Sequence, residues 1–310
     1  MVVKGKYAMC VGATAGIGRA IALRLAQLEA NVTVVGRNSE AGNAILEQLK
    51  REHPSGDHSF VTIDASSMKS ISKGCESYLK NAQSNPLHYL VMTQGIASVS
   101  GRIETAEGIE SKLAVHYYGR VLFQRQLAEK LKKTALQPEE NDVRVLSILS
   151  GGVHGPYTNF EDLDLKKSYS IRNAADAAGF YTDLAMDQLS RDTEYLTTAG
   201  IDPMSESVVK RGISFIHAAP GIVKTTWGKD FPFYLNLPIR VLQQFAKSPE
   251  ECAEMMVQHG LMGGARWGQG FHVMGAKGEE AKLTDAHTDE NREKVWAHTN
   301  QVIERALNSK

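Results

Sequence analysis

The chain has 310 residues, of which 42% are hydrophobic and 23% are charged. These proportions are close to those of ordinary globular proteins, so they exclude a disordered, collagen-like or coiled-coil chain. The 35 lysines and arginines balance 35 aspartates and glutamates, and this lack of a basic excess argues against nucleic acid as a partner. The sequence contains no run of 18 apolar residues, so we expect no integral membrane segment.

The three cysteines, Cys10, Cys75 and Cys252, are far apart and form no CxxC motif. Their spacing predicts neither a disulfide framework nor a metal site, and we expect buried thiols in a reducing compartment. An apolar run already begins at Tyr7, which leaves little room for a signal peptide. We therefore predict a cytoplasmic protein.

Short apolar runs alternate with amphipathic stretches along most of the chain. The apolar runs predict strands at residues 7–11, 31–35, 59–63, 88–92, 143–149 and 213–217. The amphipathic stretches predict helices at residues 17–28, 41–51, 67–81, within 108–131, at 173–191, and from about residue 288 onward.

This alternation predicts an α/β fold with a single doubly wound parallel sheet (a Rossmann fold) and helices on both faces. Right-handed crossovers place all the carboxyl ends of the strands at one edge, where ligands bind. No linker-like change in composition divides the chain, so we predict one domain over residues 1–310. Two segments interrupt the pattern: 193–211 is polar and predicts a surface insertion, and 227–247 is rich in aromatic residues. The second segment predicts either a substrate lid or a hydrophobic plug that closes the core.

Three glycines, Gly12, Gly16 and Gly18, lie between the first predicted strand and the first predicted helix. The first glycine permits a tight turn, the second lets a phosphate approach the backbone, and the third lets the helix pack closely on the sheet. Amide groups at the start of the helix would then face an anionic pyrophosphate. We predict a dinucleotide-binding turn, to which Thr14 and Ile17 also contribute.

The second predicted strand is followed by Gly36, Arg37 and Asn38. An acidic residue at this point would accept a hydrogen bond from the ribose and repel a 2′-phosphate. Arg37 instead offers a planar guanidinium that can pair with that phosphate. The pair Arg37 and Asn38 therefore predicts NADP(H) as the cofactor. The alternative is that Arg37 is a solvated arginine in a turn and does not bind a phosphate.

The glycine spacing resembles that of the short-chain dehydrogenase/reductase family, and the resemblance extends over roughly residues 5 to 230. Val11 stands where the family has a threonine. The family's Asn-Asn-Ala-Gly after the fourth strand is here Met92-Thr93-Gln94-Gly95, which keeps only the glycine. The family's Pro-Gly-x-Val-x-Thr after the sixth strand is intact. The resemblance implies that the cofactor is also contacted by Asp64, Gln94, Gly95, Pro220, Gly221, Val223 and Thr225.

The resemblance also shows where this chain departs from the family's catalytic set of Ser, Tyr and Lys with a supporting Asn. Ser150 matches the serine. Counting without a gap from Ser150 places the tyrosine position on Ala175 and the lysine position on Gly179, neither of which can transfer a proton. The position of the supporting asparagine falls on His116, and no Tyr-x-x-x-Lys occurs anywhere in the chain.

Other side chains are therefore candidates for the proton donor, because reduction of a carbonyl leaves an alkoxide that must be protonated. Our candidate catalytic residues are Ser150, His116 and Tyr157, and His154 and His217 are further possibilities. An ordinary structural role remains open for each of them, and the tyrosines Tyr169 and Tyr181 are expected to be packing residues.

The branch of the family that this chain resembles most is the group of retinol-dehydrogenase-like members. These share an extended connection after strand five, which is seen here as Phe160-Glu161-Asp162-Leu163 and Tyr169-Ser170. We expect an atypical NADP(H)-dependent oxidoreductase that acts on a small apolar carbonyl or alcohol, as in secondary metabolism. A non-redox enzyme on the same fold, such as an isomerase, dehydratase or cyclase, and a non-catalytic nucleotide-binding protein are the alternatives. The family also implies a possible homo-oligomer.

Overall fold

The computed structural model describes residues 3–137, 142–194, 212–224 and 246–309. The predicted lid at 227–247 lies outside the described residues except for its last two positions, and the predicted insertion at 193–211 lies almost entirely outside them.

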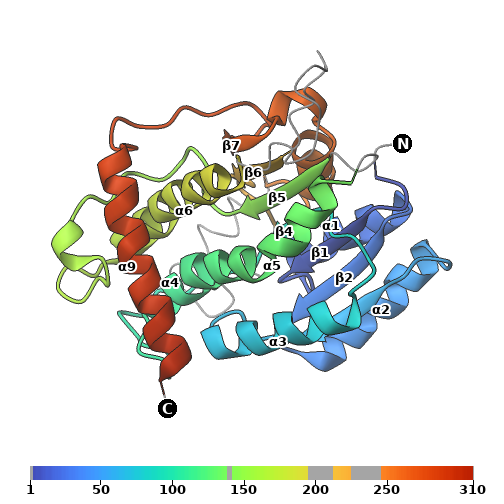
Figure 1. The fold of residues 1–310 in the computed structure, drawn as a ribbon, viewed down its shortest axis with the longest axis horizontal. Helices are drawn as coiled ribbons and strands as arrows, with labels where there is room; N and C mark the ends of the chain where they lie inside the picture. Colours follow the sequence, from blue (N-terminus) through green and yellow to red (C-terminus); the bar gives the residue numbers. More distant parts are fainter. Residues whose placement is uncertain (1–2, 138–141, 195–211, 225–245, 310) are drawn as a thin grey trace.

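The core of the described structure is a parallel sheet of seven strands in the order β3-β2-β1-β4-β5-β6-β7 (Figure 1). The strands are β1 (Tyr7–Val11), β2 (Asn31–Gly36), β3 (Ser59–Thr62), β4 (Tyr89–Met92), β5 (Val143–Ile148), β6 (Ile213–Ala218) and β7 (Gly270–Met274). The strand order reverses between β1 and β4, and ligands of open parallel sheets bind in the crevice that such a reversal leaves at the carboxyl ends. The predicted doubly wound α/β fold is confirmed.

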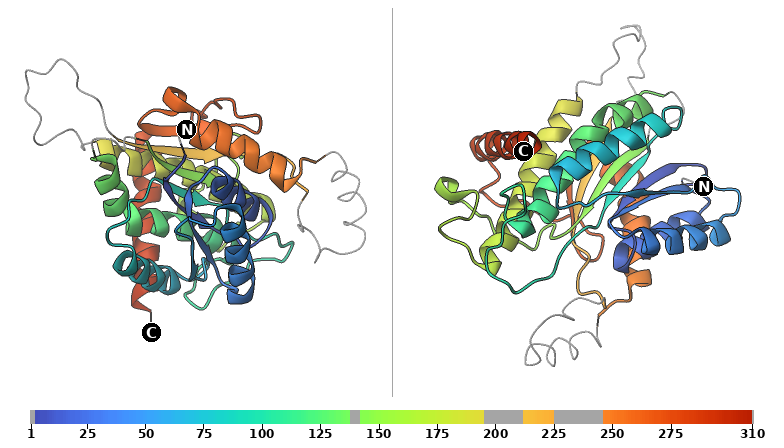
Figure 2. Two further views of the ribbon diagram at one scale, coloured as in Figure 1. Left: turned by 90° about the vertical axis from the view of Figure 1, so that its right-hand side faces the viewer. Right: turned by 90° about the horizontal axis from the view of Figure 1, so that it is seen from below.

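Helices cover both faces of the sheet. One face carries α1 (Gly16–Gln27), α2 (Ser39–Glu52) and α8 (Pro249–Met255), and the other carries α3 (Met68–Asn81), α5 (Gly119–Ala135), α6 (Ile171–Glu194) and α9 (Asp289–Asn308). Figure 2 shows α8 beside the first helices, with α5, α6 and α9 on the opposite side of the sheet. Because both faces are buried, the central strands are continuous apolar runs, which is why the sequence predicted them well.

The helix expected within 108–131 is three pieces: α4 (Ser111–Leu113), the π-helical turn η1 (Ala114–Tyr118) and α5. The π-turn inserts an extra residue in the helix and lies where the supporting asparagine was predicted. Such turns are frequent at functional sites. Two elements were not predicted, β7 and α8. The strand β7 lies at the edge of the sheet and is half exposed over its first three residues, so it lacks the apolar run that marks a buried strand.

Several short helical turns complete the fold: η2 (Phe160–Asp162), η3 (Met256–Leu261) and η4 (Gly264–Trp267). The helix α9 lies across the face formed by α3, α5 and α6, where Tyr117 meets Thr299 through a 2.6 Å hydrogen bond. Among the described helices none is long and apolar enough to cross a membrane. The three cysteines are buried and unpaired, as predicted, and burial raises the pKa of Cys10 to about 12.

Candidate active site

The glycine turn after β1 brings the backbones of two loops together. Gly12 has a φ of +78°, and a Cβ at this position would lie 2.6 Å from the backbone nitrogen of Gln94 in the loop after β4. A Cβ on Gly18 would lie 2.7 Å from the carbonyl oxygen of Gly12. The two positions therefore require glycine for the reasons that the sequence suggested: a left-handed turn and close packing of the helix.

The amino terminus of α1 differs from those of α2, α3, α8 and α9. Its N-cap residue, Ala15, makes no side-chain capping bond, and its first turn holds no acidic residue. By contrast, α2, α3, α8 and α9 are capped by Asn38, Ser67, Ser248 and Thr288. The first amide groups of α1 thus have no side-chain acceptor and point with the positive end of the helix dipole toward the edge of the sheet, as an anion would require.

The loop after β2 holds the residues predicted to select the cofactor. A Cβ on Gly36 would lie 2.6 Å from Cγ2 of Thr14, so the glycine leaves room for the Thr14 side chain in the loop after β1. Arg37 is exposed, and within the described part of the chain its guanidinium has no hydrogen-bond or ion-pair partner. Asn38 caps α2 by accepting a hydrogen bond from the amide of Ala41 at 2.9 Å, so its side-chain oxygen already has a structural role.

Asp64, predicted from the resemblance to contact the adenine, closes a turn after β3. Its Oδ1 accepts hydrogen bonds from the amide and the hydroxyl of Ser66 at 2.9 and 2.7 Å. This bonding fixes the carboxylate beside the end of β3 and leaves its other oxygen for a ligand.

Gln94 is the most unusual side chain of the cofactor edge. It is 5% exposed, yet neither its amide nitrogen nor its amide oxygen has a hydrogen-bond partner among the described residues. A buried amide without partners is costly, on the order of 1–3 kcal/mol, so it marks a place where a polar ligand belongs. Together with the uncapped start of α1, the Gln94 amide fits a polar dinucleotide at the carboxyl ends of β1 and β4.

Arg120, which sequence reasoning missed, holds the loop that carries Gln94. Its guanidinium donates to the carbonyl oxygens of Met92 and Gln94 at 3.1 and 2.6 Å and to the hydroxyl of Ser147 at 2.8 Å. The side chain is buried without a carboxylate, and burial lowers the pKa of Arg120 to about 9. The sequence signal that could have revealed Arg120 is a charged residue among the apolar residues of a predicted helix.

The motif after β6 is in place as far as the structure describes it. Gly221 has a φ of +73°, and the segment that follows pairs with residue 247 through a parallel bridge at Val223. Pro220 accepts a weak hydrogen bond from the thiol of Cys252. Thr225 lies outside the described residues.

Ser150 stands two residues after the end of β5, at the same edge. Its hydroxyl oxygen is buried and has no partner among the described residues, while its amide donates to Nε2 of His217 at 3.2 Å. A Cβ on Gly179 would lie 2.6 Å from that hydroxyl oxygen. The serine therefore faces Gly179, the residue on which gap-free counting places the family's lysine.

The positions assigned by gap-free counting lie on α6 as expected, with Ala175 exposed and Gly179 buried. The tyrosine Tyr181 is 1% exposed and packs edge-on against Tyr117 and Tyr157, so it belongs to the core. A tyrosine–lysine contact does exist elsewhere: Lys112 donates to the hydroxyl of Tyr169 at 2.7 Å.

Two of the candidate proton donors have other partners in the structure. His116, in the π-turn, is partly buried, and its Nε2 accepts a hydrogen bond from the amide of Ile96 at 2.9 Å. Burial and the positive charges of Arg120 and Lys112 lower the pKa of His116 to about 3, so this imidazole is neutral and its Nε2 has no proton to give. We therefore interpret His116 as the residue that holds the loop around Gly95.

Tyr157 is 7% exposed, and its hydroxyl lies 2.7 Å from that of Ser168 and 3.3 Å from the carbonyl oxygen of Asp162. These bonds fix the loop between β5 and α6 from within. The tyrosine thus has a packing and bracing role in this conformation, and its hydroxyl does not face Ser150.

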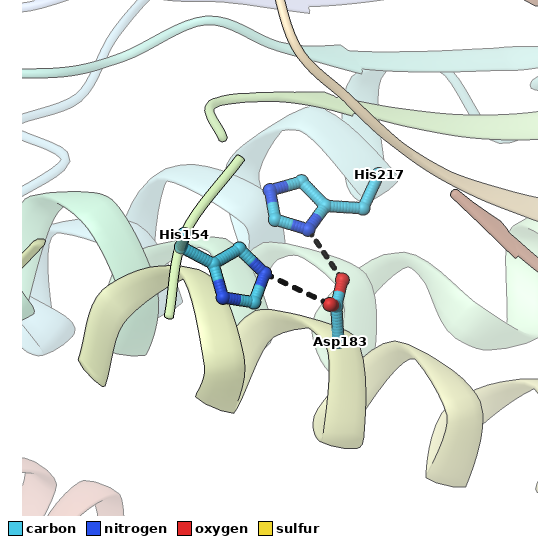
Figure 3. A group of neighbouring side chains, drawn as sticks. All are labelled: His154, Asp183 and His217. Carbon is cyan, nitrogen blue, oxygen red and sulfur yellow. Dashed lines mark hydrogen bonds and ion pairs between the residues drawn. The ribbon is translucent and has the colours of Figure 1, made fainter. Parts of the chain in front are cut away.

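The two further histidines converge on a carboxylate that the sequence did not reveal (Figure 3). Asp183, 2% exposed on α6, accepts from Nδ1 of His217 at 2.5 Å, from Nε2 of His154 at 2.9 Å and from Nε2 of His287 at 3.1 Å. Burial alone would raise the pKa of Asp183, but the three imidazoles outweigh it and hold that pKa well below its usual range. We call Asp183, His154, His217 and His287 the histidine cluster.

The described geometry agrees with a comparison to known proteins. Residues 6–160, half of the chain, match the family described as short chain dehydrogenase. The chain belongs to the short-chain dehydrogenase family. Two solved structures share its fold: an NADPH-bound carbonyl reductase from chicken fatty liver has a TM-score of 0.60 and 16% identity over 90% of this chain and 100% of that one. A short-chain dehydrogenase/reductase of Serratia marcescens has a TM-score of 0.61 and 15% identity over 90% and 99%.

Curated members of the short-chain dehydrogenase family include similar proteins from fungi and a mouse enzyme. An oxidoreductase of Emericella nidulans is 28% identical over 97% of this chain and 93% of its own length. An oxidoreductase of Emericella variicolor is 33% identical over 69% of this chain and 57% of its own length. The polyprenol dehydrogenase of Mus musculus is 27% identical over 94% of this chain and 82% of its own length.

Proposed function

We propose that the protein is an NADP(H)-dependent oxidoreductase that reduces a small apolar carbonyl or oxidises the corresponding alcohol, with Ser150 at the reacting oxygen. The observation that carries the proposal is a row of polar groups at the ends of three adjacent strands that have no side-chain partner in the described part of the chain. The row consists of the uncapped start of α1 after β1, the Gln94 amide after β4 and the Ser150 hydroxyl after β5. When bound, the dinucleotide would supply the hydride.

The preference for NADP(H) rests on Arg37. The guanidinium is exposed at the end of β2, it has no partner among the described side chains, and the glycine before it keeps the approach open. Pairing with a 2′-phosphate would give it charge-assisted hydrogen bonds in a fork geometry.

The preference for an apolar substrate rests on where exposed apolar side chains gather. Six of them lie on segments that follow the carboxyl ends of β4 to β7: Val99, Ile103, Val153, Ile171, Ile222 and Leu283. By contrast, Leu136 follows α5, at the opposite edge of the sheet. An apolar surface around a few polar groups is typical of sites for apolar ligands. The named activities of the fungal and mouse relatives are compatible with this proposal.

Cofactor choice is tested by titrating the protein with NADPH and with NADH and following nucleotide fluorescence. Arg37→Ala should weaken NADPH binding by about 10- to 100-fold, because a charge-assisted hydrogen bond contributes roughly 1.5–3 kcal/mol. NADH binding should change little. Arg51→Ala is the matched control, since Arg51 is also exposed but lies at the far end of α2. Equal losses for the two nucleotides would contradict the phosphate assignment.

Turnover is tested by following NADPH absorbance with a panel of apolar aldehydes and ketones. Ser150→Ala should lower the rate by about 10²-fold, the usual effect of removing one donor to a developing oxyanion. Product formed without oxidation of NADPH would favour an isomerase, dehydratase or cyclase instead. Tight nucleotide binding without any product would favour a nucleotide-binding protein.

We further propose that the protein forms a homo-oligomer, which gel filtration tests. We also propose a cytoplasmic location, which fractionation of cells tests.

A further inference from the structure

The histidine cluster lies beside the reacting edge, directly against Ser150. Its members come from four separate segments: the loop after β5, α6, β6 and the loop before α9. The rings of His154 and His217 are stacked with their centroids 5.8 Å apart, and each is hydrogen-bonded to a different oxygen of the Asp183 carboxylate (Figure 3). The cluster is therefore a buried group of titratable side chains next to a serine that faces the site.

Hydrogen bonds determine which imidazole carries the extra proton. Nε2 of His217 accepts from the amide of Ser150, so its proton lies on Nδ1, which donates to Asp183. His154 faces Asp183 with Nε2 and the carbonyl oxygen of Gly155 with Nδ1, at 2.9 and 3.1 Å. Both of these oxygens can only accept, so His154 carries a proton on each nitrogen and is an imidazolium.

The third imidazole, His287, and the other charged neighbours are compatible with a charged His154 and a neutral His217. Nδ1 of His287 lies 3.1 Å from both the amide nitrogen and the carbonyl oxygen of Thr284, so either protonation state is bonded. Asp176, one turn before Gly179, accepts from the amide of Gly155 at 2.8 Å and adds a second negative charge near His154. On the other side, the Arg120 guanidinium disfavours charge on His217.

The same hydrogen bonds argue that protons, rather than a metal ion, lie between the imidazoles and the carboxylate. Three ligand-type atoms of His154, Asp183 and His217 do lie within 4.8 Å of one another. A neutral imidazole has one lone pair, however, and that of His217 is occupied by the amide of Ser150. Its nitrogen that faces Asp183 carries a proton and has nothing to offer a cation.

The imidazolium occupies the space that a side chain on α6 would need. A Cβ on Gly179 would lie 2.5 Å from Cδ2 of His154 and 2.6 Å from the hydroxyl oxygen of Ser150. A side chain at 179 and the ring of His154 therefore exclude each other. Where the family places a lysine cation on the helix, this chain has a glycine and a cation supplied by the neighbouring loop.

We propose that His154 is the proton donor of this site. The Ser150 hydroxyl holds the carbonyl oxygen of the substrate, and the Nδ1–H bond of His154 breaks as an O–H bond forms on that oxygen. A bound reduced dinucleotide would supply the hydride for the carbonyl carbon, and the neutral His154 then regains its proton from solvent. Nδ1 is the nitrogen that gives the proton, because its partner in this conformation is the neutral carbonyl oxygen of Gly155, at 3.1 Å, whereas Nε2–H is held by the carboxylate of Asp183 at 2.9 Å. This inference rests on the proposed reductase function.

The protonation of His154 is tested in the protein alone, without nucleotide, by ¹⁵N NMR of the imidazole nitrogens. His154→Gln assigns the signal, and both nitrogens of His154 should show the shift of a protonated nitrogen at pH 7. In Asp183→Asn the signal should become that of a neutral ring at the same pH. A His154 that is neutral at pH 7 in the wild-type protein overturns the inference and leaves the proposed function standing.

The catalytic role is tested by carbonyl reduction across pH 5 to 9. His154→Gln should lower kcat by about 10²–10⁴-fold, the usual contribution of a general acid, while the Kd of NADPH stays the same. The wild-type rate should fall as pH rises and His154 loses its proton, and the variant should lack this dependence. His298→Gln is the matched control, because His298 also pairs with an aspartate, Asp164, but does not belong to the histidine cluster.

Tyr169→Phe separates this inference from its main competitor. Tyr169 accepts a hydrogen bond from Lys112 and is the described tyrosine that contacts a lysine through its hydroxyl. If Tyr169→Phe abolishes reduction and His154→Gln does not, His154 is not the donor. If His154→Gln does not fold, His154→Asn and the NMR measurement on the wild-type protein decide. A wild-type protein that reduces no carbonyl overturns both the inference and the proposed function.

Discussion

The two halves of the sheet differ in how closely they match the pattern of the short-chain dehydrogenase family. The first half holds the proposed nucleotide site, and the second holds the proposed reacting groups. In the first half, β1 to α3, the glycine turn and the uncapped helix are where the family pattern places them. In the second half, β5 to β7, gap-free counting places the family's tyrosine and lysine on Ala175 and Gly179, and a buried carboxylate gathers three imidazoles beside Ser150. The backbone geometry of the glycine turn is retained in the first half, whereas we propose that the second half moves its proton in a different way.

The largest effect that would sharpen this contrast is expected at Asp183. Asp183→Asn removes a 2% exposed charge that holds an imidazolium, and breaking a buried ion pair from one side costs about 3–5 kcal/mol of unfolding free energy. Asp164→Asn is the control, because its pair with His298 is partly exposed and should cost about 1 kcal/mol or less. Urea unfolding measures both, and equal losses would mean that the cluster contributes no more than a surface pair.

The nucleotide half is tested at Gly12. Gly12→Ala places a Cβ 2.6 Å from the backbone nitrogen of Gln94, so we expect NADPH binding to weaken by at least about tenfold, or about 1.4 kcal/mol. Gly5→Ala is a close control: its φ is +77°, but a Cβ there meets no atom within 4 Å. Isothermal titration that finds the same affinity in both variants would show that the close approach of the two loops is not needed for binding.

The pH dependence of stability tests the charge on His154. Burial lowers the pKa of His154, but the hydrogen bond and charge of Asp183, with the Gly155 carbonyl and Asp176, raise it above its ordinary value. A raised pKa gives stability that is complete below about pH 6.5, the unfolded value, and is lost as pH rises through the folded pKa. His154→Gln should therefore cost more unfolding free energy at pH 6 than at pH 9, and chemical unfolding at the two values measures this. An unchanged difference would mean that the imidazole is neutral throughout.

The smallest expected effect is a partial return to the family's catalytic set. Ala175→Tyr with Gly179→Lys alone should not increase carbonyl reduction, because a side chain at 179 collides with His154 and Ser150. Adding His154→Ala removes the ring and should give the triple variant a modest gain over the double variant. Steady-state rates compare the two, and a double variant that is as active as the triple one would show that the ring does not block that position.

Much of the fold follows from local sequence. The six predicted strands match β1 to β6 within one or two residues, because parallel strands that are buried on both faces consist of short runs of apolar residues. The edge strand β7 and the π-turn were missed, since neither has a periodicity of its own. Of the candidate donors, His116 and Tyr157 were assigned from their distance to motifs along the chain, but the structure gives both of them internal partners.

The order of strands and helices, the glycine turn and the vacant positions on α6 were determined by the sequence, because each depends on spacing within a short stretch of chain. The position of the proton was decided by tertiary structure. Asp183 is an ordinary helix residue until the fold brings His154, His217 and His287 to it from three other segments. Charge in a buried site depends on every neighbour within hydrogen-bond reach, and those neighbours are distant in sequence.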